Sequence, residues 1–439
     1  MQLKENYKIL SFLLILLSSS SFFLGFYLDE NSAGGGSYVG DWVFLWPNLE
    51  LFIDNDLYTA ITHKNFLTNR SPLLYILHAS LNPFVDNAIA YRRSVFVISL
   101  IVPVLFYFCL KQKFKQKDNL LLLLISSTIF LSPYFRTSSF WGLEENYGLI
   151  CLLLTYLFLN SFLENKNEYG YKIYFQLFLT TLSSSLCIYF DQKLLIIPII
   201  SFLTIIISKK IVRLKLFLIC FYIILSIPYI YLITLWGGIF PTHLTNVRNL
   251  GNQLYPEHIG YASTIIAFYF LPFLLFKEKN LFIDVKNFFL QKDNYYLILL
   301  FLIYIFYLLI LSIFYEQDFL NIETSVGKGF IHKFSFILFK ENFILREIFI
   351  YFSFLISWLI ILIFLDKNLK NSLILLYFFI VSVITLPLFQ EYFDPLILII
   401  VFTFFSSKIF ISYKNVMILF FYLSIFLVIS NIYYYNLLN

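Results

Sequence analysis

A carboxylate pair, Asp29-Glu30, directly follows the first apolar run of the chain. A carboxylate at a membrane surface can act as a general base on an acceptor group that is held there. Arg70 begins a later apolar stretch, just before Ser71-Pro72. A guanidinium at headgroup depth, near a helix N-terminus, is a good phosphate or pyrophosphate ligand. These residue types predict proton transfer and phosphate binding at one face of a membrane.

Each of these groups also has a structural interpretation. Asp29-Glu30 can be the solvated end of a helix, and Arg70 can be an ordinary contact with lipid headgroups. Arg92-Arg93 stands just before the second apolar run. It is either a structural pair at a helix end or, through Arg93, a second anion contact.

Further polar residues occur in the same segments. Asp54 and Asp56 form a D-x-D pattern, which either binds a divalent metal or ends a helix. Arg136 and Glu144-Glu145 bracket a short turn, where we expect a structural ion pair, with a phosphate contact by Arg136 as the alternative. The remaining candidates for substrate contact are Asp41, Glu144, His243, His332 and Tyr392. No catalytic triad, phosphate loop or metal-ligand spacing occurs, so we expect no metal and no cofactor.

The elements that position these residues are apolar helices. Of the 439 residues, 60% are apolar and 13% are charged, whereas soluble domains have about 45–50% apolar and about 25% charged residues. This composition excludes a soluble globular protein. It predicts an all-α protein that crosses the membrane many times, and the formal charge of +5 is too small to suggest a nucleic-acid partner.

Apolar runs without Asp, Glu, Lys or Arg predict thirteen membrane helices, with a range of eleven to thirteen. Two of the runs, Leu194–Ser208 and Pro395–Ser407, are short for a full crossing. The other runs are Ile9–Leu28, Ser94–Leu110, Leu120–Phe135, Asn146–Leu163, Ile173–Phe190, Leu216–Leu235, Ile259–Phe276, Tyr295–Tyr315, Ile348–Leu365, Ser372–Phe389 and Val416–Tyr434.

The basic residues predict the orientation of these helices. With the N-terminus inside and the thirteen runs alternating, 20 of the 31 basic residues lie inside and 18 of the 26 acidic residues lie outside. Segments 29–93, 236–258 and 316–347 are then on the outer face of the cytoplasmic membrane, and Lys111–Lys117 is cytoplasmic. We expect the C-terminus outside, a retained first helix, and a single membrane domain without a soluble C-terminal domain.

The first outer segment is predicted to carry two helices that lie in the membrane interface, at 41–56 and 71–84. Both stretches are apolar, but they are interrupted or too short to span a bilayer. Trp42, Trp46 and Tyr75 are suitable interfacial anchors.

The order of these features resembles the GT-C fold glycosyltransferases, integral-membrane enzymes such as the aminoarabinose transferases of lipid A and the protein mannosyltransferases. The resemblance rests on LDE (28–30), DWVFLWPNLELF (41–52), NRSPLLYIL (69–77) and AYRRSVFV (90–97), and on WGGIFP (236–241) and EYFDP (391–395). It implies that Asp29 is the catalytic carboxylate with Glu30 beside it, and that Arg70 and Pro72 match the pattern facing the lipid phosphate. Two residues depart from the family pattern: Ser71 replaces a common Pro, and Glu391 replaces a common Arg.

The implied reaction is transfer of a sugar from a polyprenyl-phosphate-linked donor to a hydroxyl or amine of a glycolipid, polysaccharide or protein, with inversion. The expected partners are this donor, the acceptor and the lipid bilayer. An O-antigen ligase or polymerase is an alternative, because segment 316–347 contains Lys328, His332, Lys333 and Arg346. The sequence is also compatible with a lipid or glycan flippase, with another kind of transporter, and with a structural membrane subunit.

Overall fold

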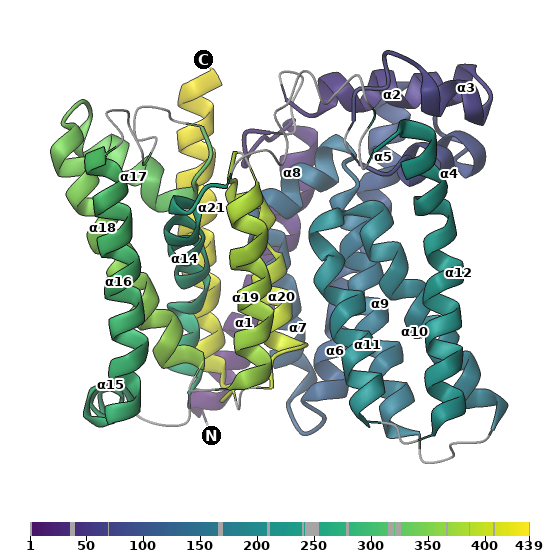
Figure 1. The fold of residues 1–439 in the computed structure, drawn as a ribbon. Helices are drawn as coiled ribbons and strands as arrows, with labels where there is room; N and C mark the ends of the chain where they lie inside the picture. Colours follow the sequence, from purple (N-terminus) through teal and green to yellow (C-terminus); the bar gives the residue numbers. More distant parts are fainter. Residues whose placement is uncertain are drawn as a thin grey trace. The chain divides into compact units, whose positions relative to one another are not determined.

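The computed structural model describes the chain except for residues 1, 36–39, 69, 166–169, 209–210, 239–240, 242–253, 278–280, 315–319, 321–325, 366–367, 386, 407–408 and 439. The described residues form helices and no strand (Figure 1). They divide into two compact units. The first comprises residues 1–248 and 420–439, and the second comprises residues 249–419.

Eight helices in the described part of the chain are long and apolar enough to cross a membrane, and a bent pair of helices raises the count to nine. Helix length and hydropathy therefore identify a multi-pass membrane protein. The eight spans are Glu5–Tyr27, Ala88–Lys113, Glu145–Glu164, Tyr171–Phe190, Val212–Trp236, Tyr295–Phe314, Phe343–Leu365 and Tyr413–Tyr435.

The prediction of thirteen spans is wrong. Each of the eight spans coincides with a predicted run, but five runs form helices that are short, broken or bent. These runs are Leu120–Phe135, Leu194–Ser208, Ile259–Phe276, Ser372–Phe389 and Pro395–Ser407.

Proline accounts for most of these differences, because it lacks a backbone N–H and disfavours helical conformation in the residue before it. Helix α14 (Glu257–Phe270) gives way to a short 3-10 helix, η3, that begins at Pro272. Helix α19 (Leu369–Ile384) ends shortly before Pro387. Helix α20 (Leu396–Phe402) begins where its predicted run begins but ends at Phe402, and no proline follows it. A count of apolar residues does not register these interruptions.

The bent pair is the break most relevant to the candidate site. Helix α7 (Asn119–Ser127) and the 3-10 helix η1 (Thr128–Leu131) are followed by α8 (Pro133–Trp141). The two halves meet at an angle of 68°. Pro133 is the first residue of α8, and the Ser132 hydroxyl caps the helix by accepting a hydrogen bond from the backbone N–H of Phe135 over 3.0 Å. A new helix N-terminus is therefore formed within an apolar region.

The first unit is a bundle in which α9 packs on α6 and α10, and α1 packs on α7. Figure 1 shows α2 to α4 across one end of this bundle and the α6–α7 connection at the opposite end. Helices form at both of the stretches predicted to lie in the interface, as α2 and α4. The helices not yet given are α1 (Gln2–Tyr27), α2 (Trp42–Asp54), α3 (Leu57–Thr62), α4 (Leu73–Leu81), α5 (Ala88–Ser99), α6 (Ile101–Lys113), α9 (Glu145–Glu164), α10 (Tyr171–Phe190), η2 (Gln192–Leu195), α11 (Ile196–Ser208) and α12 (Val212–Trp236).

The second unit is organised around α14, which packs against α17, α18 and α19. Its remaining helices are α15 (Leu281–Leu290), α16 (Lys292–Phe314), α17 (Gly329–Phe339), α18 (Phe343–Leu365) and η4 (Gln390–Tyr392). The last helix of the chain, α21 (Tyr413–Leu438), contributes its first residues to the second unit and residues from 420 onward to the first.

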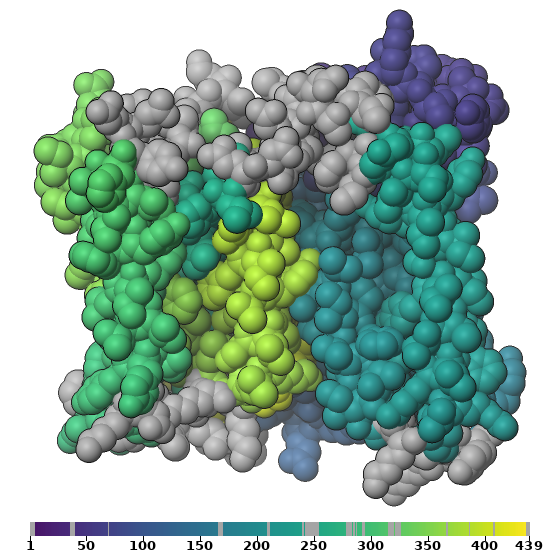
Figure 2. Space-filling model, in the orientation of Figure 1, coloured from purple at the N-terminus to yellow at the C-terminus, as the bar shows by residue number. Residues whose placement is uncertain are grey.

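Large apolar side chains cover the outer faces of the spans. In α12, for example, Ile223, Ile227 and Ile230 are each more than half exposed. In α16, Leu300, Ile303 and Phe306 are also more than half exposed, and Figure 2 shows both helices at the surface. A face of this length and composition is matched to lipid tails, and it indicates association with a bilayer.

The two ends of the first unit should react from opposite sides of the membrane. Helix α3 and the α6–α7 connection lie at opposite ends of the bundle. With the N-terminus inside, as the basic residues predict, we expect an impermeant maleimide added from outside to label a cysteine at Tyr58, in α3, but not one at Lys115. Both side chains are exposed. The background carries Cys220→Ser, since Cys220 is the exposed native cysteine. Labelling of Lys115 alone would reverse the proposed N-inside orientation, and labelling of both without permeabilisation would contradict the placement of the two ends.

Candidate functional site

Three arginines pair with carboxylates near the end of the first unit where α2 to α4 lie. Arg70 lies just before α4, Arg92 lies in α5 and Arg136 lies in α8, and these elements meet near the turn between α8 and α9. The pairs are Arg92 with Asp29, Arg136 with Glu30, and Arg70 with both Glu144 and Glu145.

Asp29, which pairs with Arg92, is the most exposed of the carboxylates in these pairs. It comes two residues after the end of α1, with a φ of 51°, in the left-handed region that few residues other than glycine adopt. Its Oδ1 accepts a hydrogen bond from Nη2 of Arg92 over 2.6 Å, and 57% of the side chain is exposed. Among the described residues, Oδ2 has no hydrogen-bonding partner. One carboxylate oxygen is thus oriented by a cation, while the side chain remains accessible.

Arg92 is itself fixed from two further directions. Its Nε donates to the carbonyl oxygen of Phe140 over 2.8 Å, and its guanidinium carbon lies 4.1 Å from the centre of the Trp141 ring. This stacking on an aromatic face restrains the guanidinium plane. From the sequence, Arg93 was the expected anion contact of this pair. The structure leaves Arg93 exposed, without an ion pair to a described residue, and turns its neighbour Arg92 towards Asp29.

Glu30 and Arg136 form a buried, two-pronged ion pair. Nε of Arg136 donates to Oε1 of Glu30 over 2.7 Å, and Nη2 donates to Oε2. Nη1 and Nη2 also donate to the carbonyl oxygens of Phe130 (3.0 Å) and Ser21 (2.8 Å). Only 2% of the Arg136 side chain is exposed. The structure therefore places Arg136 in contact with Glu30, in the protein interior.

Gly25 makes room for this pair within α1. A Cβ built on Gly25 would lie 2.4 Å from Nη2 of Arg136 and 2.4 Å from Oε2 of Glu30, which is closer than atoms can approach. A glycine inside an otherwise apolar predicted span is the one signal of this close approach in the sequence.

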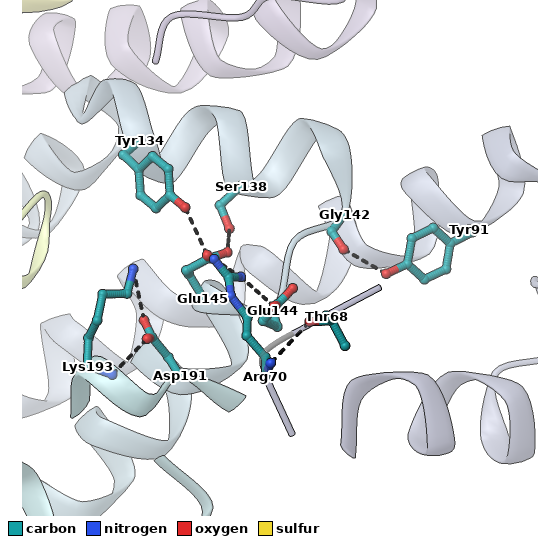
Figure 3. Close-up of polar contacts among 10 residues, drawn as sticks. All are labelled: Thr68, Arg70, Tyr91, Tyr134, Ser138, Gly142, Glu144, Glu145, Asp191 and Lys193. Atoms are coloured by element: carbon teal, nitrogen blue, oxygen red, sulfur yellow. Dashed lines mark hydrogen bonds and ion pairs between the residues drawn. The ribbon is translucent and has the colours of Figure 1, made fainter. Parts of the chain in front are cut away.

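Arg70 anchors a second cluster (Figure 3). Its Nη1 donates to Oε1 of Glu145 over 2.7 Å and to Glu144. The same carboxylate of Glu145 accepts hydrogen bonds from the Tyr134 hydroxyl (2.8 Å) and the Ser138 hydroxyl (3.2 Å). Glu145 is therefore bound on both oxygens, and 25% of the Arg70 side chain remains exposed.

The ion pair expected between Arg136 and Glu144-Glu145 is absent from the described contacts. Glu30 takes Arg136, and Arg70 takes both glutamates. Proximity along the chain suggested the first pairing, but α8 directs Arg136 towards α1, on the side away from its own C-terminal turn. The partners lie 106 residues apart in one pair and 74 and 75 residues apart in the other.

Burial dominates the electrostatics of Glu144. It raises the pKa of this carboxyl to about 7; Arg70 opposes the shift and Glu145 adds to it. Burial alone would lower the pKa of Arg70, but Glu144 and Glu145 outweigh it and Asp41 adds to their effect, so this pKa is raised well above its ordinary value. Two adjacent carboxylates that share one guanidinium are expected to hold one proton between them near neutral pH.

Lys193 and Asp191, which were not among the residues selected from the sequence, extend this cluster. Their charged groups are 3.4 Å apart, and the ammonium lies 5.5 Å from the centre of the Tyr134 ring. They come from the connection between α10 and α11, which Figure 3 shows beside Glu145. A short charged break between two apolar runs was the available signal.

A buried histidine, His78, lies nearby. Asn82 accepts from the backbone N–H of Phe84 through Oδ1, so its Nδ2 donates to Nδ1 of His78 over 2.8 Å. Nε2 then carries the proton and donates to the Tyr147 hydroxyl over 2.8 Å. Burial lowers the pKa of His78 to about 4. This histidine is neutral and links α4 to α9.

The two aspartates of the D-x-D pattern lie where helices end and begin. Asp54 is the last residue of α2, and Asp56 caps α3 by accepting from the backbone N–H groups of Tyr58 (3.0 Å) and Thr59 (3.1 Å). The Thr59 hydroxyl also donates to Oδ2 of Asp56 over 2.5 Å, and this hydrogen bond, followed by that from the backbone N–H of Thr59, lowers the pKa of Asp56. Asp54 thus ends one helix and Asp56 begins the next, in line with the helix-ending interpretation of this pattern.

The other candidate residues are distributed over both units. Asp41 precedes α2 in the first unit. In the second unit, His332 is buried in α17 with its ring 5.5 Å from that of Tyr261, and the Tyr392 hydroxyl donates to the carbonyl oxygen of Pro387 over 3.4 Å. His243 lies outside the described residues.

The raised pKa of Glu144 predicts how stability depends on pH. The folded state holds a proton that the unfolded carboxyl releases near 4.5, so this residue's contribution should fall as pH rises from about 4.5 to about 7. Glu144→Gln should flatten this part of the profile of melting temperature against pH in detergent. Glu164→Gln, at an exposed glutamate paired with Lys115, is the matched control. An unchanged slope in Glu144→Gln would contradict the assignment.

Comparison of the chain with protein-family models, with curated proteins and with solved structures finds no match. The charge pairs at the turn between α8 and α9 are therefore the basis of the functional assignment.

Proposed function

We propose that this protein is a membrane glycosyltransferase that takes a sugar from a polyprenyl-phosphate-linked donor. The observation that carries the proposal is the state of Asp29. It is a half-exposed carboxylate at the end of a membrane span. Buried Arg92 orients it, and the neighbouring residue, Glu30, is fixed by its ion pair with Arg136. A carboxylate in this setting is suited to accept a proton from an acceptor group.

The difference between Asp29 and Glu30 supports separate roles for them. Both oxygens of Glu30 accept hydrogen bonds from Arg136, and its backbone oxygen accepts from Nε1 of Trp141 over 3.1 Å. Oδ2 of Asp29, in contrast, makes no hydrogen bond to a described residue. We therefore assign the general base to Asp29 and give Glu30 a positioning role.

Arg70 and Arg93 are the cations that we assign to the donor phosphate. Nε and Nη2 of Arg70 make no hydrogen bond to a described residue, while Nη1 is held by Glu144 and Glu145. An arginine anchored through one nitrogen can present the other two to a phosphate. Arg93 is exposed and lacks an intramolecular carboxylate partner among the described residues. Arg136 is buried and occupied, so we assign it to Glu30.

In the proposed reaction, the acceptor oxygen or nitrogen attacks the anomeric carbon, and its proton passes to Asp29. The bond between the anomeric carbon and the phosphate oxygen breaks, and the electron pair leaves with the phosphate. Arg70 stabilises the charge that develops on this leaving group. A phosphate leaves without protonation, so one base and one or two cations suffice. In-line attack inverts the anomeric configuration.

Asp29→Asn tests the base, because it keeps the side-chain shape and tolerates the left-handed backbone but cannot accept the proton. We expect the transfer rate to fall about 10²–10⁴-fold with donor affinity little changed. The assay uses membranes, a labelled polyprenyl-phosphate sugar and an envelope acceptor fraction. Asp54→Asn, at the end of α2 in the same segment, is the matched control and should keep wild-type activity. More than half of wild-type activity in Asp29→Asn would exclude Asp29 as the base.

Arg70 variants test the phosphate contact. Arg70→Ala should raise the donor KM and lower the rate, because the guanidinium meets the phosphate in both ground and transition states. Arg70→Lys should recover only part of the loss, since an ammonium cannot provide the forked contact. Equal donor KM values in wild type, Arg70→Ala and Arg70→Lys would assign Arg70 to the Glu144–Glu145 cluster alone.

A further inference from the structure

Helix α21 contacts the segment that follows Asp29 at two points. Nδ2 of Asn431 donates to Oε1 of Glu30 over 3.3 Å and to the carbonyl oxygen of Leu427, in its own helix, over 3.2 Å. Tyr434 lies against Gly34, where a Cβ would be 2.1 Å from its ring. Asn431 and Tyr434 are three residues apart, so they share one face of α21.

Helix α8 holds the same segment from another side. The hydroxyl of Ser32 donates to the carbonyl oxygen of Pro133 over 2.9 Å. The backbone N–H of Ala33 donates to the Thr137 hydroxyl over 3.1 Å. Together with Arg136, these contacts bind residues 30–34 (the 30–34 turn) to α8, while Asn431 and Tyr434 bind them to α21.

The 30–34 turn adjoins one left-handed residue and ends at another. Asp29 has a φ of 51° and Gly34 has a φ of 78°. The left-handed region is unfavourable for aspartate and persists where the surrounding structure imposes it. With this backbone conformation, the Asp29 carboxylate points towards Arg92 and accepts its hydrogen bond. Contacts on the turn therefore act on the direction of the Asp29 side chain.

The amide of Asn431 is chemically suited to this position. Glu30 already has a full positive charge from Arg136, and Asn431 adds a hydrogen-bond donor without adding charge. An aspartate in its place would set a second carboxylate against Glu30 in a poorly hydrated region, where like charges repel strongly.

We propose that Asn431 and Tyr434 form a C-terminal clasp that holds the 30–34 turn on α8 and thereby sets the position of Asp29. Both are positioning residues, because they touch Glu30 and Gly34 and not the reacting groups. The catalytic consequence of the clasp rests on the proposed function, whereas its effect on the position of residue 29 does not.

Kinetics of purified variants test the catalytic consequence. We expect Asn431→Ala to lower kcat about 10-fold or more with the donor KM unchanged, since small displacements of a reacting group have effects of up to about 10²-fold. Asn431→Asp should be more severe, and Asn431→Gln, which keeps the amide donor, should be milder than Asn431→Ala. Asn415→Ala is the matched control: the same residue type in the same helix, bonded to Leu275 and Phe410 and not to the turn. It should keep the wild-type kcat.

Labelling of residue 29 tests the clasp without reference to activity. In an Asp29→Cys, Cys220→Ser background, the rate of reaction with an impermeant maleimide reports the surroundings of the thiol beside Arg92. We expect Asn431→Ala to change this rate at least about threefold and Asn415→Ala to leave it unchanged; threefold corresponds to about 0.67 kcal/mol at 1.4 kcal/mol per tenfold.

Unchanged labelling and unchanged kcat in both Asn431→Ala and Asn431→Asp would overturn the clasp. A lower yield of folded protein with wild-type kcat and labelling would also overturn it, because it would show a structural role alone. If Asp29→Asn is active while Asn431→Ala still alters the labelling, the clasp stands and the proposed function fails. The two proposals are therefore separable.

Discussion

The buried ion pair between Glu30 and Arg136 is the constraint on which the candidate site depends. A guanidinium that is 2% exposed requires a complete set of acceptors, and Glu30, Phe130 and Ser21 supply them. Removing one partner from a buried pair typically costs about 3–5 kcal/mol, because the remaining charge is left uncompensated. Helix α1 is thereby bound to α8, and Glu30 cannot move independently of either.

The position of α8 follows from the break before it. A continuous helix through Leu120–Phe135 and onward would carry the residues of α8 past the end of the bundle. The 68° bend at Ser132-Pro133 turns α8 instead, so that its polar side chains point into the protein. Arg136 then meets α1, while Tyr134 and Ser138 meet Glu145. One helix of nine residues supports both charge clusters.

The two clusters contain two kinds of charged residue. The carboxylates of Glu30 and Glu145 are largely buried, and each accepts several hydrogen bonds. Asp29 and Arg70 are each held through one atom and partly exposed. Rigid, fully paired residues thus support residues with unused bonding capacity, which is the arrangement that preorganised sites require.

The sequence by itself determined the class of the protein and most of its spans. Hydropathy is a sum over neighbouring residues, so long apolar runs such as Leu216–Leu235 and Tyr295–Tyr315 identify membrane helices without any tertiary information. The helices at 41–56 and 71–84 followed from the same reasoning. Summed hydropathy does not register where a proline ends a helix. Such a proline accounts for most of the five predicted spans that are wrong.

Only the tertiary structure decided which charges meet. The pairing of Arg136 with Glu30, of Arg70 with Glu144 and Glu145, and of Asn431 with Glu30 joins residues that are 74 to 401 residues apart. A buried arginine takes whichever carboxylate packing brings within hydrogen-bonding distance, and distance along the chain does not determine this. The choice of Arg92 over Arg93 as the partner of Asp29 has the same origin, since the rotation of α5 against α1 and α8 decides which of two adjacent side chains faces inward.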